Sequence, residues 1–108
     1  MKMRRKAAAR PTRSVRPQLV RAIALASDLT IAQAGALKSR LERLLDVAGP
    51  VSLDAGATRR IDTACFQLLL AFVRDRQLAG KPVTWSATAP EFTATAHTLG
   101  LSAALGLA

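Results

Sequence analysis

The sequence predicts an α/β fold, with one mixed β-sheet of about four strands flanked by α-helices. Short segments of strand character alternate along the chain with segments of helical periodicity, and the connections between them are short. About half of the 108 residues are apolar, which suffices for one core. No apolar stretch approaches the ~20 residues that a membrane span requires.

The positive charge is concentrated at the N-terminus. The formal net charge is +9, and Met1 to Arg21 holds eight Lys or Arg residues and no acid. The remaining chain has eight positive and seven negative residues, a net of +1. Residues 1–17 combine this charge with Pro11 and Pro17 and are predicted to be a disordered basic tail, leaving one folded domain over residues 18–108.

Two functions remain open for the tail. It is either a solvated appendage or a weak, salt-dependent attachment to nucleic acid, acidic lipid or an acidic partner. No aromatic residue interrupts its charges to stack on bases, and it lacks the apolar core of a secretory signal.

The sequence predicts no catalytic residue, metal site or cofactor, and no small-molecule substrate. Cys65 and His97 are the single cysteine and histidine, which excludes an internal disulfide and a Cys/His zinc site and favours a reducing, cytoplasmic setting. Cys65 is expected to be a buried structural thiol. Asp54 and Asp62 fit loop and cap roles rather than acid/base chemistry.

The first half of the domain predicts two strands and an amphipathic helix. Leu19–Leu25 alternates loosely and contains β-branched residues, which favours a strand, and after a turn at 26–28 a second short strand can run over Leu29–Ile31. From Gln33 to Asp46 apolar residues recur at offsets of three and four, so we expect a helix that lies on the sheet. Gly49-Pro50 ends it.

The central stretch predicts a strand and a buried helix. Val51–Leu53 alternates as a short strand, and Ala55–Arg60 has the small and charged residues of a connection. Asp62 and Thr63 are both good N-cap residues. Ala64–Val73 is almost continuously apolar, which indicates a helix buried against the sheet.

The last third predicts one strand and one helix before an apolar end. Residues 74–77 are expected to return the central helix to solvent, and Gly80 to end it. Val83–Trp85 favours a short strand, and Ala89–Leu99 a helix with proline in its first turn. Leu101–Leu107 fits either a last strand or a short docked helix.

The order of four short motifs resembles the STAS domain of bacterial anti-sigma factor antagonists and related proteins. The motifs are Val51-Ser52-Leu53-Asp54, Ile61-Asp62-Thr63-Ala64, Gly80-Lys81-Pro82-Val83 and Leu99-Gly100-Leu101. The resemblance covers roughly residues 19–107. It implies a STAS-like fold and a small regulatory module that docks on a larger, frequently ATP-binding, protein.

The resemblance also implies the site. Thr63 would be the phosphorylatable residue, with Asp62 beside it and Asp54 ordering the preceding loop. We expect a partner surface formed by the loop and the first turns of the central helix, at Arg59, Arg60, Asp62, Thr63 and Gln67. From the residues alone, the simpler interpretation of the Thr63 hydroxyl is a helix cap and nothing more, and it is the resemblance that favours phosphorylation.

Two departures from the family pattern help to decide which group of STAS proteins the chain resembles more. Cys65 stands where a Gly is common, so its side chain points inward or crowds the approach to the helix. Thr30 stands where sigma-regulating members usually have an Asp. The chain is closer to the STAS subunit of the Mla-type lipid transporter, which docks on the transporter ATPase. An anti-sigma factor antagonist that binds a kinase is the alternative, constitutive docking stays open, and nucleic-acid binding through residues 1–17 is the weakest alternative.

Overall fold

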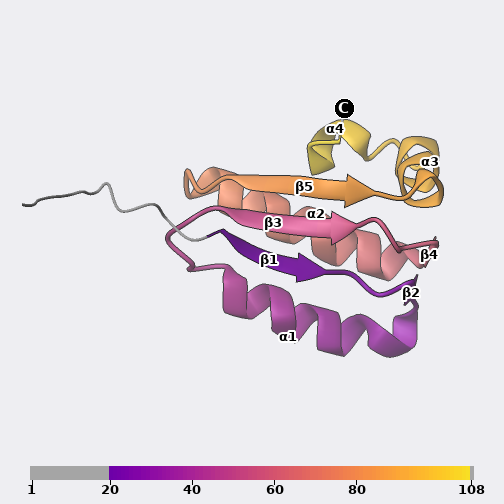
Figure 1. Cartoon of the computed structure of the whole chain (residues 1–108), viewed down its shortest axis with the longest axis horizontal. Helices are drawn as coiled ribbons and strands as arrows, with labels where there is room; N and C mark the ends of the chain where they lie inside the picture. The colour runs from indigo at the N-terminus through magenta and orange to yellow at the C-terminus, as the bar shows by residue number, and fades with distance from the viewer. Residues whose placement is uncertain (1–19, 108) are drawn as a thin grey trace, which may run out of the picture.

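A computed structural model describes residues 20–107. The predicted tail, residues 1–17, lies outside this range. The elements, in chain order, are β1 (Arg21–Ala24), β2 (Asp28–Leu29), the 3₁₀ helix η2 (Ile31–Gln33), α1 (Ala34–Leu44), β3 (Val51–Ala55), β4 (Arg60–Ile61), α2 (Thr63–Leu78), β5 (Val83–Thr88), α3 (Pro90–Thr98) and α4 (Ser102–Leu105). Figure 1 shows that the sheet and the two long helices run along the same axis.

The main sheet has the order β1-β3-β5, and both of its pairings are parallel. Val51 at the start of β3 lies opposite Arg21 on one side and Val83 on the other. β2 and β4 form a separate parallel pair. The α/β class is confirmed, but every pairing among the described strands is parallel rather than mixed. The reason is that α1 and α2 each carry the chain back across the sheet before the next strand begins.

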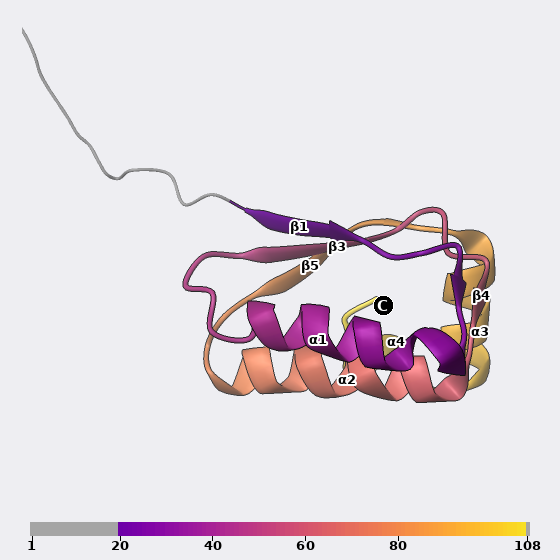
Figure 2. The same ribbon diagram turned by 90° about the horizontal axis from the view of Figure 1, so that it is seen from below.

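The long helices cover one face of the sheet. Figure 2 shows α1 and α2 side by side beneath the strands, and no helix of residues 20–107 on the opposite face. Val51, Leu53 and Ala55 of β3 point toward the helices and are completely buried. Leu37 and Leu41 of α1 close the core from the side. β3, the middle strand of the sheet, therefore contributes side chains to the centre of the core.

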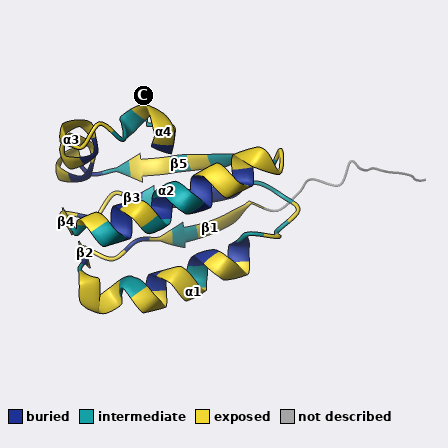
Figure 3. Cartoon of the chain, turned by 180° about the vertical axis from the view of Figure 1, so that it is seen from behind, coloured by how far each residue is buried: buried dark blue, intermediate teal, exposed yellow. Residues whose placement is uncertain are grey.

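α2 crosses the sheet as the predicted central helix. Figure 3 shows its buried positions interrupted by exposed ones. Phe66, Leu69 and Val73 face the core, whereas Leu68 and Ala71 are half-buried and line a shallow cleft of about 150 Å³ against α1. Among residues 20–107, no helix has both the length and the hydropathy to cross a membrane.

Arg76 contradicts the expectation that residues 74–77 are exposed. Its side chain has no exposed area, and burial lowers its pKa. Its Nη1 and Nη2 atoms donate to five backbone carbonyls at 2.6–3.3 Å, those of Leu44, Leu45, Val47, Gly49 and Pro82. One guanidinium thus binds the C-terminus of α1, the following loop and the residue before β5. The Leu44 and Leu45 carbonyls lie at the negative end of α1, which favours a cation, and the five acceptors together explain how the guanidinium can be buried.

The C-terminal end is a docked helix rather than a strand. β5 extends to Thr88, beyond the predicted Trp85. Trp85 lies opposite Leu53, and its Nε1 donates to the carbonyl of Leu105 in α4 at 2.8 Å. The Phe92 ring lies 5.2 Å from both the Trp85 and the Phe66 rings. Trp85 is therefore a packing residue that attaches α4 to the core.

A candidate docking site at the start of α2

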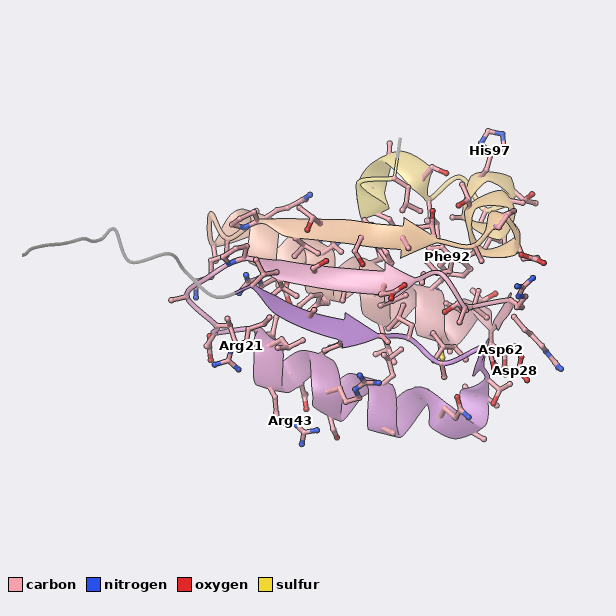
Figure 4. The ribbon with its side chains drawn as sticks, in the orientation of Figure 1. Arg21, Asp28, Arg43, Asp62, Phe92 and His97 are labelled. Atoms are coloured by element: carbon pink, nitrogen blue, oxygen red, sulfur yellow. The ribbon has the colours of Figure 1, made fainter. Side chains whose placement is uncertain are left out.

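The candidate site residues meet where the parallel strands end and α2 begins. β3 ends at Ala55, β4 follows, and α2 starts at Thr63. Figure 4 shows Asp28 and Asp62 together at this end of the molecule, with Arg21 and Arg43 at the other. The predicted residues lie in the connection that follows β3 and in the first turns of α2. They are grouped because these two segments are consecutive in the chain.

Thr63 is exposed and is the first residue of α2. Asp62 occupies the N-cap position with an extended backbone, and its main-chain carbonyl accepts hydrogen bonds from the N–H groups of Cys65 and Phe66. No side chain caps α2. The interpretation of the Thr63 hydroxyl as the N-cap is therefore wrong, and its phosphorylation stays a prediction.

The Asp62 carboxylate binds a distant part of the chain instead of its own helix. Its Oδ2 accepts a hydrogen bond from the Ile31 N–H at 2.8 Å, and the Asp62 N–H donates to the Leu29 carbonyl. The Cys65 thiol donates to the Thr30 carbonyl at 3.5 Å. The segment Leu29–Ile31 is thus attached to the start of α2 at three points, two of them in the corner at Thr30–Ile31.

This attachment explains why the predicted Leu29–Ile31 strand is shorter in the structure. Leu29 pairs with Ile61, and the chain then leaves the two-stranded ladder because the Asp62 carboxylate takes the next free N–H, that of Ile31. A 3₁₀ turn over Ile31–Gln33 follows and leads into α1. The sequence alone offered no signal for this contact, which joins residues 31 positions apart.

The loop after β3 is closely packed at its first turn. Asp54 Oδ1 accepts the Gly56 N–H at 2.8 Å. A Cβ at Gly56 would lie 3.0 Å from that same Oδ1 and 3.2 Å from the Ala87 Cβ, so the turn needs a residue without a side chain. Asp54 contacts the loop backbone here, and its role in function remains a prediction.

The burial of Thr58 and the hydrogen bond of its hydroxyl were not predicted from the sequence. It lies in a segment predicted as a connection, yet its side chain is fully buried. Its Oγ1 donates to the Ala26 carbonyl at 2.9 Å, and its N–H donates to the Ala55 carbonyl. The loop is therefore anchored to the turn after β1, and the residues that follow it start from a fixed backbone.

Arg59 and Arg60 project from this anchored backbone. Both N–H groups donate to the Ser27 carbonyl. Arg59 also forms an ion pair with Glu91 at 2.9 Å, in which the side chains are 63% and 46% exposed. The backbone N–H of Glu91 and then the Arg59 guanidinium lower the pKa of the Glu91 carboxyl. Arg60 is exposed, as is Gln67 one turn into α2.

Cys65 and His97 take no part in this surface. Cys65 is completely buried, and burial, followed by the nearby Asp62 charge, raises the pKa of its thiol. It points inward rather than crowding the helix start. His97 is exposed on α3 and points away from the body in Figure 4. Within residues 20–107, no three His, Cys, Asp or Glu side chains gather closely enough to hold a metal ion.

Comparison with known proteins supports the relationship suggested by the motifs. Residues 15–107 match the family described as "Mlab, STAS domain". Neither the curated proteins nor the solved structures contain a significant match to this chain. STAS domains are generally non-catalytic modules for protein interaction and regulation. Since the match covers most of the chain, the protein belongs to the STAS-domain family.

Proposed function

We propose that this protein is a regulatory subunit that docks on the ATPase of a lipid transporter, and that phosphorylation of Thr63 weakens the docking. The docking surface is formed by Arg59, Arg60, Asp62, Thr63 and Gln67. The observation that carries the proposal is that Thr63 is exposed beside a loop whose backbone is fixed by hydrogen bonds to Ser27 and Ala26. A fixed, exposed surface can be recognised without paying the entropy of ordering a loop.

The proposed switch follows from charge. Phosphorylation would add about −2 charge at pH 7 to the first residue of a 16-residue helix. The positive end of a helix dipole tolerates such a group, so the domain should remain folded. The added charge and volume would act on the partner instead, because Thr63 is exposed and is one of the residues assigned to the docking surface.

Two observations favour the transporter ATPase over an anti-sigma kinase. The matched family is described by its Mla-type member. Position 30 carries a threonine and not the acid expected of a sigma-regulating member. The backbone carbonyl of Thr30 accepts a hydrogen bond from the Cys65 thiol. The kinase is therefore the second candidate, and binding of nucleic acid through residues 1–17 the third.

The direct test measures binding to the purified transporter ATPase and, separately, to the anti-sigma kinase. We expect Thr63→Ala to bind the ATPase like the wild type, Thr63→Glu to bind at least about tenfold more weakly, and neutral Thr63→Gln to fall between them. Thr98→Glu, on the exposed end of α3, is the matched control for added charge. Mass spectrometry of the native protein shows whether Thr63 is modified.

The same assay tests the rest of the surface. Arg59→Ala and Arg60→Ala should each weaken binding, whereas Arg43→Ala at the other end should not. If all of these variants bind the ATPase equally, the assigned surface is wrong. Binding to the kinase alone would favour the antagonist role, and loss of nucleic-acid binding on deletion of residues 1–17 would support the third candidate.

A further inference from the structure

The N-cap residue of α2 uses its carboxylate in an unusual way. An N-cap aspartate normally accepts an N–H from the first turn of its own helix. Asp62 makes no such bond, although its extended backbone would permit one. Its one side-chain hydrogen bond among the described residues goes to the Ile31 N–H. The carboxylate next to Thr63 therefore holds a different segment in place.

That segment presents an exposed apolar side chain. Ile31 is 66% exposed, although its backbone is fixed at the N–H by Asp62 and at the preceding carbonyl by Cys65. The other large apolar side chains exposed in residues 20–107 are Val20, Leu78 and Leu99. Leu78 ends α2, at the far end of the molecule from Thr63. An apolar side chain with a fixed backbone can bury its surface against a partner at little entropic cost.

We propose that Ile31 is an apolar contact of the docking surface, and that the Asp62 carboxylate transmits the state of Thr63 to it. This inference rests on the proposed function and names how it is regulated. The surface then joins an apolar side chain, Ile31, to the cationic side chains of Arg59 and Arg60. The complementary site on the ATPase would be an apolar depression bordered by hydrogen-bond acceptors.

The coupling has a simple electrostatic cause. A phosphate on Thr63 would place about two negative charges one residue from the Asp62 carboxylate, which is only half-buried. The two like-charged groups would repel each other, and the N–H groups at the start of α2, to which the Asp62 side chain does not bind, would hold the phosphate beside it. Rotation of Asp62 toward solvent would break its bond to the Ile31 N–H and release the Thr30–Ile31 corner.

The internal step can be measured on the protein alone. The probe is amide hydrogen exchange by NMR, comparing Thr63→phosphoserine with Thr63→Ser. We expect the Ile31 amide to exchange about tenfold faster or more in the phosphorylated form, as it should in Asp62→Ala. The Gly56 amide is an internal reference, because a different carboxylate, Asp54, holds it. Asp54→Ala should accelerate Gly56 and leave Ile31 unchanged.

The contact itself is tested by binding to the transporter ATPase. Ile31→Ser should bind at least about tenfold more weakly than the wild type. Leu78→Ser is the matched control, since Leu78 is 81% exposed but lies at the opposite end of α2. Both substitutions replace exposed side chains, so neither should change the denaturation midpoint. Measuring that midpoint for each variant verifies that both are folded.

The outcomes separate this inference from the function on which it rests. An unchanged Ile31 exchange rate in the phosphorylated form, or wild-type binding by Ile31→Ser, overturns the inference even where Thr63→Glu abolishes docking. If Ile31→Ser loses binding and the Ile31 amide responds to phosphate, while Arg59→Ala and Arg60→Ala bind normally, the inference holds and the cationic part of the proposed surface is wrong.

Discussion

The two ends of the sheet are held together by different means. At the end where α1 and α2 finish, one fully buried guanidinium, that of Arg76, binds five backbone carbonyls. Four of them precede β3 in the chain and one follows it. At the end where α2 begins, separate contacts join pairs of segments, among them Asp62 with Ile31, Thr58 with Ala26 and Arg59 with Glu91. Apart from Thr58, these side chains are at least partly exposed.

The difference indicates a division of roles. A single buried cation with five acceptors cannot change without affecting every segment that it binds, so this end maintains the fold. The contacts at the start of α2 can be altered one at a time, because each involves different atoms. Such an end can accept a phosphate or a partner while the core stays intact. Substitutions at Arg76, at Thr58 and in the Arg59–Glu91 pair test this contrast.

The largest expected effect is that of Arg76→Met on stability. Methionine fills part of the space but leaves buried carbonyls without a donor, so we expect the free energy of unfolding to fall by about 3 kcal/mol or more. Arg76→Lys should lose a smaller amount, because an ammonium cannot reach both sets of carbonyls that the guanidinium spans. Urea denaturation followed by circular dichroism measures both values.

Arg74→Met is the control for this comparison, since Arg74 is exposed on the same helix. It should change the free energy of unfolding by no more than about 0.5 kcal/mol. A value for Arg76→Met as small as that of the control would show that the guanidinium contributes nothing to the stability of this end, and the division of roles would be incorrect.

A smaller effect is expected for Thr58→Val at the other end. The two side chains have nearly the same shape, so the change removes the hydrogen bond to the Ala26 carbonyl and leaves that acceptor unpaired. We expect a loss of about 1–2 kcal/mol in thermal or urea unfolding. Thr84→Val, at an exposed position of β5, should be nearly neutral. Equal losses in the two variants would argue against a specific role for the Thr58 hydroxyl.

The smallest effect is expected at the exposed Arg59–Glu91 ion pair. Because Glu91 has a lower pKa in the folded protein, its carboxylate contributes stability that is present above the ordinary glutamate pKa of about 4.3 and is lost as the pH falls through the lower folded value. Glu91→Gln should therefore melt slightly below the wild type at neutral pH, and the difference should vanish under acid.

The melting temperature as a function of pH checks this expectation. High salt should reduce the difference as well, since both side chains are open to solvent. Adding Arg59→Gln to Glu91→Gln should cause little further loss if the two residues act as a pair. A difference that persists at low pH would show that the effect does not depend on the charge of the Glu91 carboxylate, and therefore not on the ion pair.

The elements themselves could largely be predicted from the sequence. The spacing of apolar residues predicts α1 and α2 because a helix that lies on a sheet must bury one side, and Pro90 and Gly100 mark the limits of α3. The conformation of residues 101–107 could not be predicted in this way. Short apolar runs suit strand and helix alike, and the Trp85 bond to Leu105 shows that the last segment docks as α4.

The candidate site was predictable in part. Asp62 and Thr63 mark a helix start by residue type alone, and Arg59, Arg60 and Gln67 follow from being adjacent in the chain. Ile31, Thr58 and the burial of Arg76 depended on tertiary structure, since their partners lie 31, 32 and between 6 and 32 positions away. Local sequence determines which backbone groups a strand or helix leaves unpaired. Only the packing of α1 and α2 against the sheet decides which distant side chain reaches those groups, because that choice depends on distances across the fold and not along the chain.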